Sequence, residues 1–211
     1  MTVVAILNEK GGVGKTTIAT NLARGLQLAG QTVILIDSDP QGSARDWYAV
    51  AGEDNSRPPV VGMDRAPLFK NLKSVTAGFD WAIIDGSPRM EEIAVAALKV
   101  ADRVLIPVQP SPYDVWATEP LTELVKARQE LTDGRLKAAF LVSRQIVGTK
   151  LAGEVREALE GYGLPILRAF TCQRVIYANS ATQGSTVLDD EPKGAAAAEI
   201  RALVDEVLAW H

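Results

Sequence analysis

The chain contains very few of the residues that build metal centres and covalent cross-links. Among its 211 residues there is one cysteine, Cys172, and one histidine. A single cysteine cannot form an internal disulfide, and together with one histidine it cannot supply a Cys₄ or Cys₂His₂ zinc site. The sequence therefore excludes disulfide-rich and zinc-finger proteins, and it fits a reducing, cytosolic setting.

Long apolar runs and an excess of basic charge are also missing. No apolar run approaches the ~20 residues that a membrane span needs. The first residues already read as a core strand, so we expect no signal peptide. The net charge is −4, so any contact with DNA requires a local basic patch. The length and the hydrophobic fraction of 47% instead suit one α/β domain, which we place over residues 1–211.

A phosphate-binding loop is predicted between Asn8 and Thr17, where the sequence reads Asn-Glu-Lys-Gly-Gly-Val-Gly-Lys-Thr-Thr. An apolar run, Val3–Leu7, precedes it, and a helical pattern over 16–29 follows. Glycines let backbone N–H groups turn inward, and the helix N-terminus adds partial positive charge. We expect Lys15 to reach the β- and γ-phosphates of a nucleotide and the Thr16 hydroxyl to bind Mg²⁺.

Acidic residues follow two further apolar runs. Val33–Ile36 is followed by Asp37-Ser38-Asp39-Pro40-Gln41-Gly42, and Trp81–Ile84 is followed by Asp85. Ligands bind at the carboxyl ends of strands in open α/β sheets, although Asp, Ser, Pro and Gly also favour ordinary turns. With the remaining apolar runs, these segments predict an α/β fold of three α-β-α layers around a mostly parallel twisted sheet of about seven or eight strands.

The glycine-rich loop departs from the usual spacing, because Glu9 stands where the first glycine is expected and Lys10 follows it. The stretch resembles the KGGxGKT[ST] loop, the deviant Walker A motif, of the ParA/MinD family of ATPases in the SIMIBI class. That resemblance implies ATP or ADP and Mg²⁺ as cofactors and a homodimer formed with ATP, in which Lys10 reaches the partner's nucleotide. The residues that it implies for nucleotide binding in this loop are Gly11, Gly12, Val13, Gly14, Lys15, Thr16 and Thr17.

Asp37 to Gln41 is similar to the D-x-D-P-Q motif of the same family, and Asp85 to its Walker B aspartate. The resemblance implies that Asp37 and Asp85 join Thr16 at Mg²⁺, with Asp37 acting through a water molecule. It implies that Asp39 orients the attacking water, so the expected catalytic residues are Lys10, Lys15 and Asp39.

Three further positions are candidates by the same resemblance. The proline-rich loop that ends at Asp114 is either a stiff connector or part of the dimer interface, where Asp114 would pair with Lys10 of the other subunit. Arg144 is either an adenine contact or a surface arginine. Cys172 stands where relatives often place an adenine-packing proline. We expect one helix over 115–131 after this loop, and a C-terminal helix over 194–210 that packs on the domain.

Residues 173–177 read Gln-Arg-Val-Ile-Tyr and resemble the small ParF-type plasmid partition proteins. This predicts a cytoplasmic, nucleoid-associated ATPase without an N-terminal DNA-binding extension, which binds DNA non-specifically and segregates a plasmid or chromosome with a centromere-binding adaptor of the ParB/ParG kind. Four basic residues are candidates for DNA contact or for plain solvated surface: Arg168, Arg174, Lys193 and Arg201. The alternatives are a MinD-like positioning ATPase, disfavoured by the acidic C-terminal helix, and a P-loop metabolic ligase.

Overall fold

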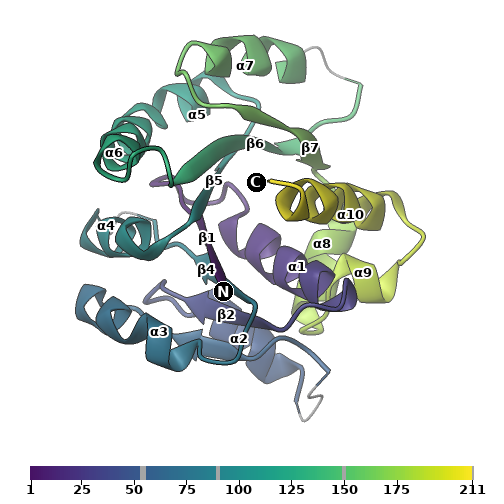
Figure 1. Cartoon of the computed structure of the whole chain (residues 1–211). Coiled ribbons are helices and arrows are strands. Elements are labelled where there is room, and N and C mark those ends of the chain that lie inside the picture. The colour runs from purple at the N-terminus through teal and green to yellow at the C-terminus, as the bar shows by residue number, and fades with distance from the viewer. Residues whose placement is uncertain (53–55, 89–90, 149–150, 211) are drawn as a thin grey trace.

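A central sheet of seven strands, all parallel, organises the fold (Figure 1). The computed structural model describes residues 1–52, 56–88, 91–148 and 151–210. The strand order is β3-β2-β4-β1-β5-β6-β7, so the first strand lies at the centre of the sheet. The predicted α/β fold is confirmed, and the sheet is more regular than the mostly parallel one that the sequence predicted.

The elements follow the apolar runs closely. The strands are β1 (Thr2–Ile6), β2 (Val33–Asp37), β3 (Val60–Gly62), β4 (Trp81–Asp85), β5 (Arg103–Val108), β6 (Lys137–Gln145) and β7 (Ile166–Cys172). The helices are α1 (Lys15–Leu28), α2 (Ser43–Val50), the 3₁₀ helix η1 (Ala66–Asn71), α3 (Leu72–Val75), α4 (Glu91–Val100), α5 (Pro112–Trp116), α6 (Glu119–Leu131), α7 (Leu151–Glu160), α8 (Val175–Thr182), α9 (Val187–Asp190) and α10 (Ala195–Leu208).

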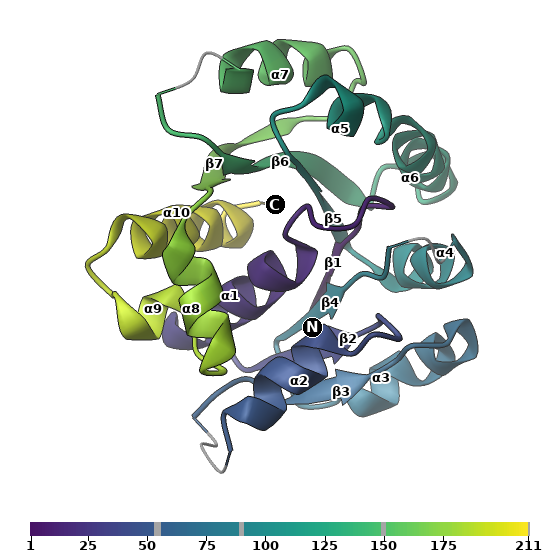
Figure 2. The ribbon, with the colours of Figure 1, turned by 180° about the vertical axis from the view of Figure 1, so that it is seen from behind.

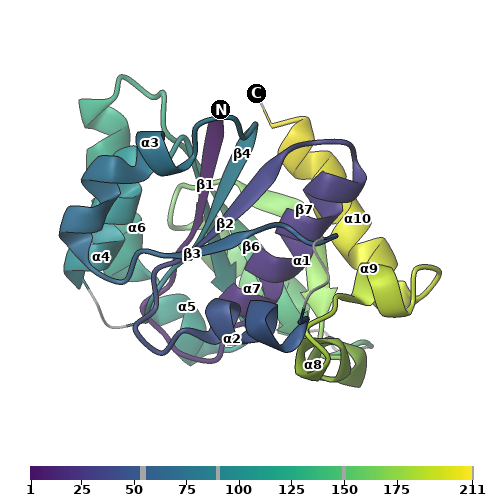
Figure 3. The same ribbon diagram turned by 90° about the horizontal axis from the view of Figure 1, so that it is seen from below.

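Two helical layers cover the two faces of the sheet. Figure 3 shows α3, α4 and α6 on one side of the strands, and α1, α9 and α10 on the other. Successive strand residues point to opposite faces, so Val4 and Ile6 join the core under α1 and α10 while Val3 and Ala5 join the core under α4 and α6. No helix of the described segments is long and apolar enough to cross a membrane.

The single helix predicted over 115–131 is wrong, because the structure has two helices there. The first, α5, ends at Trp116, and α6 begins at Glu119 with Pro120 in its first turn. Proline lacks a backbone N–H and clashes with the preceding turn, so it starts a helix more readily than it continues one. The short α5 is therefore a separate helix, which ends before α6 begins.

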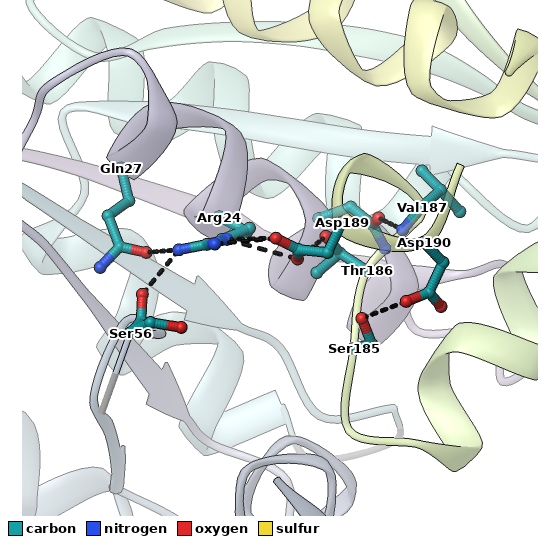
Figure 4. Close-up of polar contacts among 9 residues, drawn as sticks. Arg24, Gln27, Ser56, Ser185, Thr186, Val187, Asp189 and Asp190 are labelled. Atoms are coloured by element: carbon teal, nitrogen blue, oxygen red, sulfur yellow. Dashed lines mark hydrogen bonds and ion pairs between the residues drawn. The ribbon is translucent and has the colours of Figure 1, made fainter. Parts of the chain in front are cut away.

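Arg24 links helix α1 to the C-terminal half of the chain by an ion pair (Figure 4). Its guanidinium pairs with Asp189 at 2.8 Å and also donates to the carbonyl oxygen of Ser56 at 2.6 Å. One turn earlier in the helix, Asn21 Oδ1 accepts the backbone N–H of Val187. The segment around α9 is therefore bonded along one side of α1, which begins at the phosphate-binding loop (Figure 2).

Strand β7 lies at one edge of the sheet, and three of its backbone N–H groups are bonded to carboxylates of α10. Glu206 of α10 accepts the N–H groups of Arg168 and Ala169, at 2.9 and 2.8 Å. Glu199, also on α10, accepts the N–H of Cys172 at 3.0 Å. The register of β7 against β6 is irregular in this stretch. The acidic side of the C-terminal helix is thus bound to a sheet edge, and the predicted packing of that helix on the domain is confirmed.

Gly25 of α1 provides a sharp test of the packing between α1 and α10. A Cβ atom at this position would lie 2.5 Å from Cγ2 of Val204, a buried residue of α10. We expect Gly25→Ala to destabilise the chain by about 1–2 kcal/mol, because overpacking outweighs the gain in helix propensity. Urea unfolding followed by circular dichroism measures the change.

The matched control is Gly153→Ala in α7, where an added Cβ meets nothing within 4 Å. Here only helix propensity acts, so the variant should be more stable by about 0.5–1 kcal/mol. Equal effects of the two substitutions would show that the contact between Gly25 and Val204 does not limit the packing.

Candidate functional site

The register of the sheet brings the predicted acidic residues together. Asp37 pairs with Asp85 across β2 and β4, and Ile6 at the end of β1 pairs with Asp85 on its other side. The loop that follows β1 leads directly into α1, which begins at Lys15. Segments that are far apart in the sequence therefore converge at the carboxyl edge of the sheet, as predicted.

The glycine-rich loop has the backbone conformation that its sequence predicts. Gly12 and Gly14 have φ angles of 79° and 92°, a region that favours glycine. The loop is also held from outside, because Ser143 Oγ donates to the carbonyl oxygen of Val13 at 2.9 Å and Arg144 Nη1 to that of Gly12 at 2.6 Å. These two contacts come from the end of β6, and they fix the loop against the sheet.

Two adjoining hollows lie around this loop. The first has a volume of about 290 Å³ and is lined by the glycines of the loop, Lys15, Thr16, Thr17, Asp39, Ser43, Pro88 and Arg144. The second, of about 230 Å³, is lined by Gly14, Thr17, Arg144 and residues of the 171–181 segment. Gly14, Thr17 and Arg144 belong to both, so Arg144 lies between the two. We call the first the loop hollow and the second, which Tyr177, Ala178 and Ala181 of α8 help to line, the α8 hollow. A larger hollow of about 1120 Å³ lies between β7 and α10, away from the loop.

Lys15, which lines the loop hollow, and Asp85, at the end of β4, are both buried. Burial lowers the pKa of the Lys15 ammonium, while Asp85 and Asp39 oppose that shift. The ammonium donates to the carbonyl oxygen of Lys10 at 2.8 Å. Burial raises the pKa of Asp85 to about 7; the Thr16 hydroxyl and Lys15 oppose the rise, and Asp37 adds to it.

The carboxylate of Asp85 has the properties of a site for a divalent cation. Both of its oxygens are buried without a hydrogen bond of regular geometry, although the Thr16 hydroxyl is near enough to favour the charged form. Mg²⁺ is usually bound by one or two carboxylates together with phosphate oxygens and water. Thr16 and Asp85 fit that pattern. In the described segments, no cluster of three or more histidine, cysteine or carboxylate side chains forms a ready metal site.

Asp37 differs from Asp85, because both of its oxygens already have partners. Oδ1 accepts the N–H of Asp39 at 3.0 Å, and Oδ2 accepts the N–H of Arg45 at 2.9 Å and its Nε at 3.3 Å. Sequence reasoning missed Arg45, which carried no motif signal. Asp39 lines the loop hollow, and its role in orienting the attacking water stays a prediction.

Lys10 and Asp114 form an ion pair of 2.8 Å within one chain rather than between two chains. The loop before α5 makes this possible, since Gln109 Nε2 donates to the carbonyl oxygen of Gly12 and Asn8 Nδ2 to that of Pro107. The Lys10 side chain is 40% exposed and that of Asp114 is 7% exposed. Their pairing across a dimer interface therefore stays a prediction for another state of the protein.

Glu199 is bonded to three residues that line the α8 hollow. This carboxylate accepts bonds from Arg174 Nε at 2.8 Å, the Tyr177 hydroxyl at 3.0 Å and the backbone N–H of Cys172. Burial raises the pKa of the Cys172 thiol, so it stays protonated and packs as an apolar group. Arg174, a candidate for DNA contact, is thus ion-paired at short range. Arg168, Lys193 and Arg201 are exposed, and Arg168 lies 4.0 Å from Glu206.

We expect Asp85→Asn to stabilise the nucleotide-free protein more at pH 8 than at pH 5.5. The folded-state pKa of about 7 exceeds the unfolded value near 3.9, so stability falls as the pH rises between these values. Removing the charge should therefore add about 2 kcal/mol more stability at pH 8 than at pH 5.5. Thermal unfolding at the two pH values measures this.

Asp80→Asn is the control, because hydrogen bonds from Thr32 lower the pKa of Asp80. Asp80 is charged at both pH values, so the effect of this variant should not change between them. An Asp85→Asn effect that is equally independent of pH would show that Asp85 is ionised throughout.

Comparison with known proteins agrees with this geometry. Residues 4–187 match the family model of the CobQ/CobB/MinD/ParA nucleotide binding domain. The chain is 32% identical to maintenance of carboxysome distribution protein A of Halothiobacillus neapolitanus over 208 residues, covering 97% of this chain and 95% of that protein.

Two solved structures have the same fold. Cyanothece apo McdA superposes with a TM-score of 0.78 at 22% identity and 99% coverage of both chains. Septum site-determining protein MinD of Pyrococcus horikoshii, complexed with Mg-ADP, gives 0.75 at 18% identity, with 99% of this chain and 97% of that one covered. The chain belongs to the CobQ/CobB/MinD/ParA family and is an ATPase of the ParA/MinD type, with ATP or ADP and Mg²⁺ as its ligands.

Proposed function

We propose that the chain is a ParA-type positioning ATPase whose ATP-bound form is a dimer that binds DNA non-specifically. The observation that supports this most is the position of Lys10. This lysine is not among the residues that line the loop hollow of its own chain, and its ammonium is 2.8 Å from Asp114 with a side chain that is 40% exposed. Lys15 already supplies the lysine that one phosphate site needs, so Lys10 is available to a nucleotide held by a second copy.

Such a dimer would make ATP the switch for assembly. ATP hydrolysis depends on positioning and charge stabilisation, and in this proposal each subunit's Lys10 supplies charge to the other's nucleotide. Lys15 and Thr16 hold the phosphates and Mg²⁺ within one subunit, while Asp39 orients the water. Hydrolysis then ends the dimeric state.

We further propose that the ATPase acts on a cargo through an adaptor protein. A ParB/ParG-like centromere-binding adaptor would stimulate hydrolysis and couple the ATPase to a plasmid or chromosome, in the cytoplasm and on the nucleoid. The similarity to a carboxysome distribution protein supports a second candidate cargo, a protein-bounded compartment. Both cargoes need the same ATP-dependent binding to DNA, so they share the first test.

Membrane positioning of the MinD kind has less support. An amphipathic membrane helix must present its apolar stripe to lipid. In α10 that stripe is buried, with Ile200, Leu203 and Val207 packed in the same core as α1. Glu199 and Glu206 on the same helix are bonded to β7. A liposome sedimentation assay with ATP separates this alternative from the proposal.

The main experiment measures binding to random duplex DNA by fluorescence anisotropy, with ATP, with ADP and without nucleotide. We expect binding only with ATP, and an affinity that falls steeply as salt increases, because phosphate contacts release counterions. Lys15→Ala should bind neither nucleotide nor DNA, whereas Lys70→Ala, an exposed lysine on η1, should behave as the parent chain. No DNA binding in any nucleotide state would contradict the proposal and favour a P-loop ligase.

Lys10→Ala and Asp39→Ala should separate assembly from chemistry. Lys10→Ala should weaken the ATP-dependent dimer, because it removes charge from the partner's nucleotide. Asp39→Ala should keep the dimer and lose most of the ATP turnover, by about 100-fold or more, because the attacking water is no longer oriented. Light scattering reports the mass, and phosphate release reports turnover. A Lys10→Ala protein with the parent's dimer mass in ATP would exclude the cross-subunit role.

A further inference from the structure

Arg45 of α2 is placed against the loop that carries Asp37 and Asp39. Its Nε lies 3.3 Å from Asp37 Oδ2, and its Nη2 donates to the backbone carbonyl oxygen of Asp39 at 2.9 Å. Its Nη1 lies 3.3 Å from Asp64, just beyond β3. The guanidinium thus contacts three acceptors in three directions, while its side chain stays 38% exposed.

Two glycines leave the space that this guanidinium occupies. A Cβ atom on Gly42 would lie 3.2 Å from Arg45 Nη2, and one on Gly62 would lie 3.2 Å from Arg45 Nη1. Gly42 also has a φ of 74°, which favours glycine. Gly62 pairs with Asp37 between β3 and β2, so the sheet register itself places this gap beside the buried carboxylate.

Arg45 separates the roles of the two buried carboxylates. Asp37 is 0% exposed and its oxygens are bonded to Arg45 and to the N–H of Asp39. Asp85 is equally buried but has no such partners. A buried carboxylate that already has a guanidinium partner gains less from a second cation. The charge that remains for a metal ion is therefore mainly that of Asp85.

The same contacts fix the backbone around Asp39. Its N–H is bonded to Asp37 and its carbonyl oxygen to Arg45, so the peptide groups on both sides of its Cα are held. Its own Oδ1 accepts the N–H of Gln41 at 3.0 Å. Because Arg45 holds the backbone that carries this carboxylate, loss of Arg45 would let the carboxylate move. Small displacements of a catalytic group lower rates strongly.

We propose that Arg45 is a positioning residue of the ATPase, which compensates the charge of Asp37 and holds the backbone of Asp39 so that its carboxylate faces the loop hollow. This inference rests on the ATPase assignment and not on the cargo or on DNA binding. It gives the arginine two separable effects. One acts on the rate of hydrolysis through Asp39, and the other acts on Mg²⁺ affinity through Asp37.

The test compares Arg45→Ala and Arg45→Lys with the control Arg65→Ala. Arg65 is a neighbouring arginine whose side chain is 78% exposed and lies 4.0 Å from the same Asp64. Three quantities are measured: the turnover of ATP, the affinity for a fluorescent ADP analogue, and the Mg²⁺ concentration that gives half-maximal binding of that analogue. Arg65→Ala should leave all three unchanged.

Arg45→Ala should lower turnover by about 10- to 100-fold with little change in ADP affinity at saturating Mg²⁺. It should also lower the Mg²⁺ requirement several-fold, because Asp37 regains an uncompensated charge. Arg45→Lys should restore the Mg²⁺ requirement but only part of the turnover, since an ammonium cannot replace the planar fork of a guanidinium. Adding Asp37→Asn to Arg45→Ala should cancel the change in Mg²⁺ requirement.

A merely structural role would lower stability and nucleotide affinity together without reducing the Mg²⁺ requirement, and that result would overturn the proposal. If Arg45→Ala hydrolyses ATP as fast as the parent chain, the proposed positioning of Asp39 by Arg45 is wrong. If Arg45→Ala does not fold, Asp64→Asn weakens the outer contact of Arg45, together with the 4.0 Å contact of Arg65, and should give a smaller loss of turnover. An absence of ATP turnover in the parent chain would count against the ATPase assignment, while the Mg²⁺ dependence of ADP binding still tests Arg45.

Discussion

The burial of charge at the carboxyl edge of the parallel sheet is the constraint on which the rest of the structure depends. The strand register places Asp37 beside Asp85, next to the buried Lys15 at the start of α1. An uncompensated buried ion costs several kcal/mol. The chain compensates Asp37 with Arg45, but Asp85 has no guanidinium partner, and burial raises its pKa to about 7 although Thr16 and Lys15 oppose the rise. Binding of a cation together with phosphates should therefore stabilise the folded chain, because it compensates the charges that are buried at this edge.

Much of this could be predicted because it is local in sequence. Lys15 and Thr16 follow glycines directly, and Asp85 ends an apolar run, so each motif contains both its strand and its functional side chain. The hydrophobic runs predicted the strands, because a sheet that is buried on both faces needs continuous apolar segments. The break before α6 was missed although Pro120 marks it, since helical periodicity continues on both sides of the proline.

The parts that could not be predicted depend on contacts between distant segments. Nothing in the sequence around Arg45 shows that Gly62 will open a space for its guanidinium, because that space exists only after β3 pairs with β2. Lys10 and Asp114 were expected to interact between subunits, and only the fold shows that the loop before α5 lets them meet within one. Glu199 carried no motif, yet it bonds to Arg174 and Tyr177, which line the α8 hollow.

The carboxylates that cover β7 also limit how copies of this chain can assemble. An uncovered edge strand is a template on which another chain can add its own strand. Here Glu199 and Glu206 accept hydrogen bonds from three backbone N–H groups of β7. A neighbouring strand that paired with these groups would have to displace the two carboxylates first. A continuous intermolecular sheet is therefore disfavoured at this edge. Any contact between copies at this edge should therefore form through side chains rather than through paired backbones.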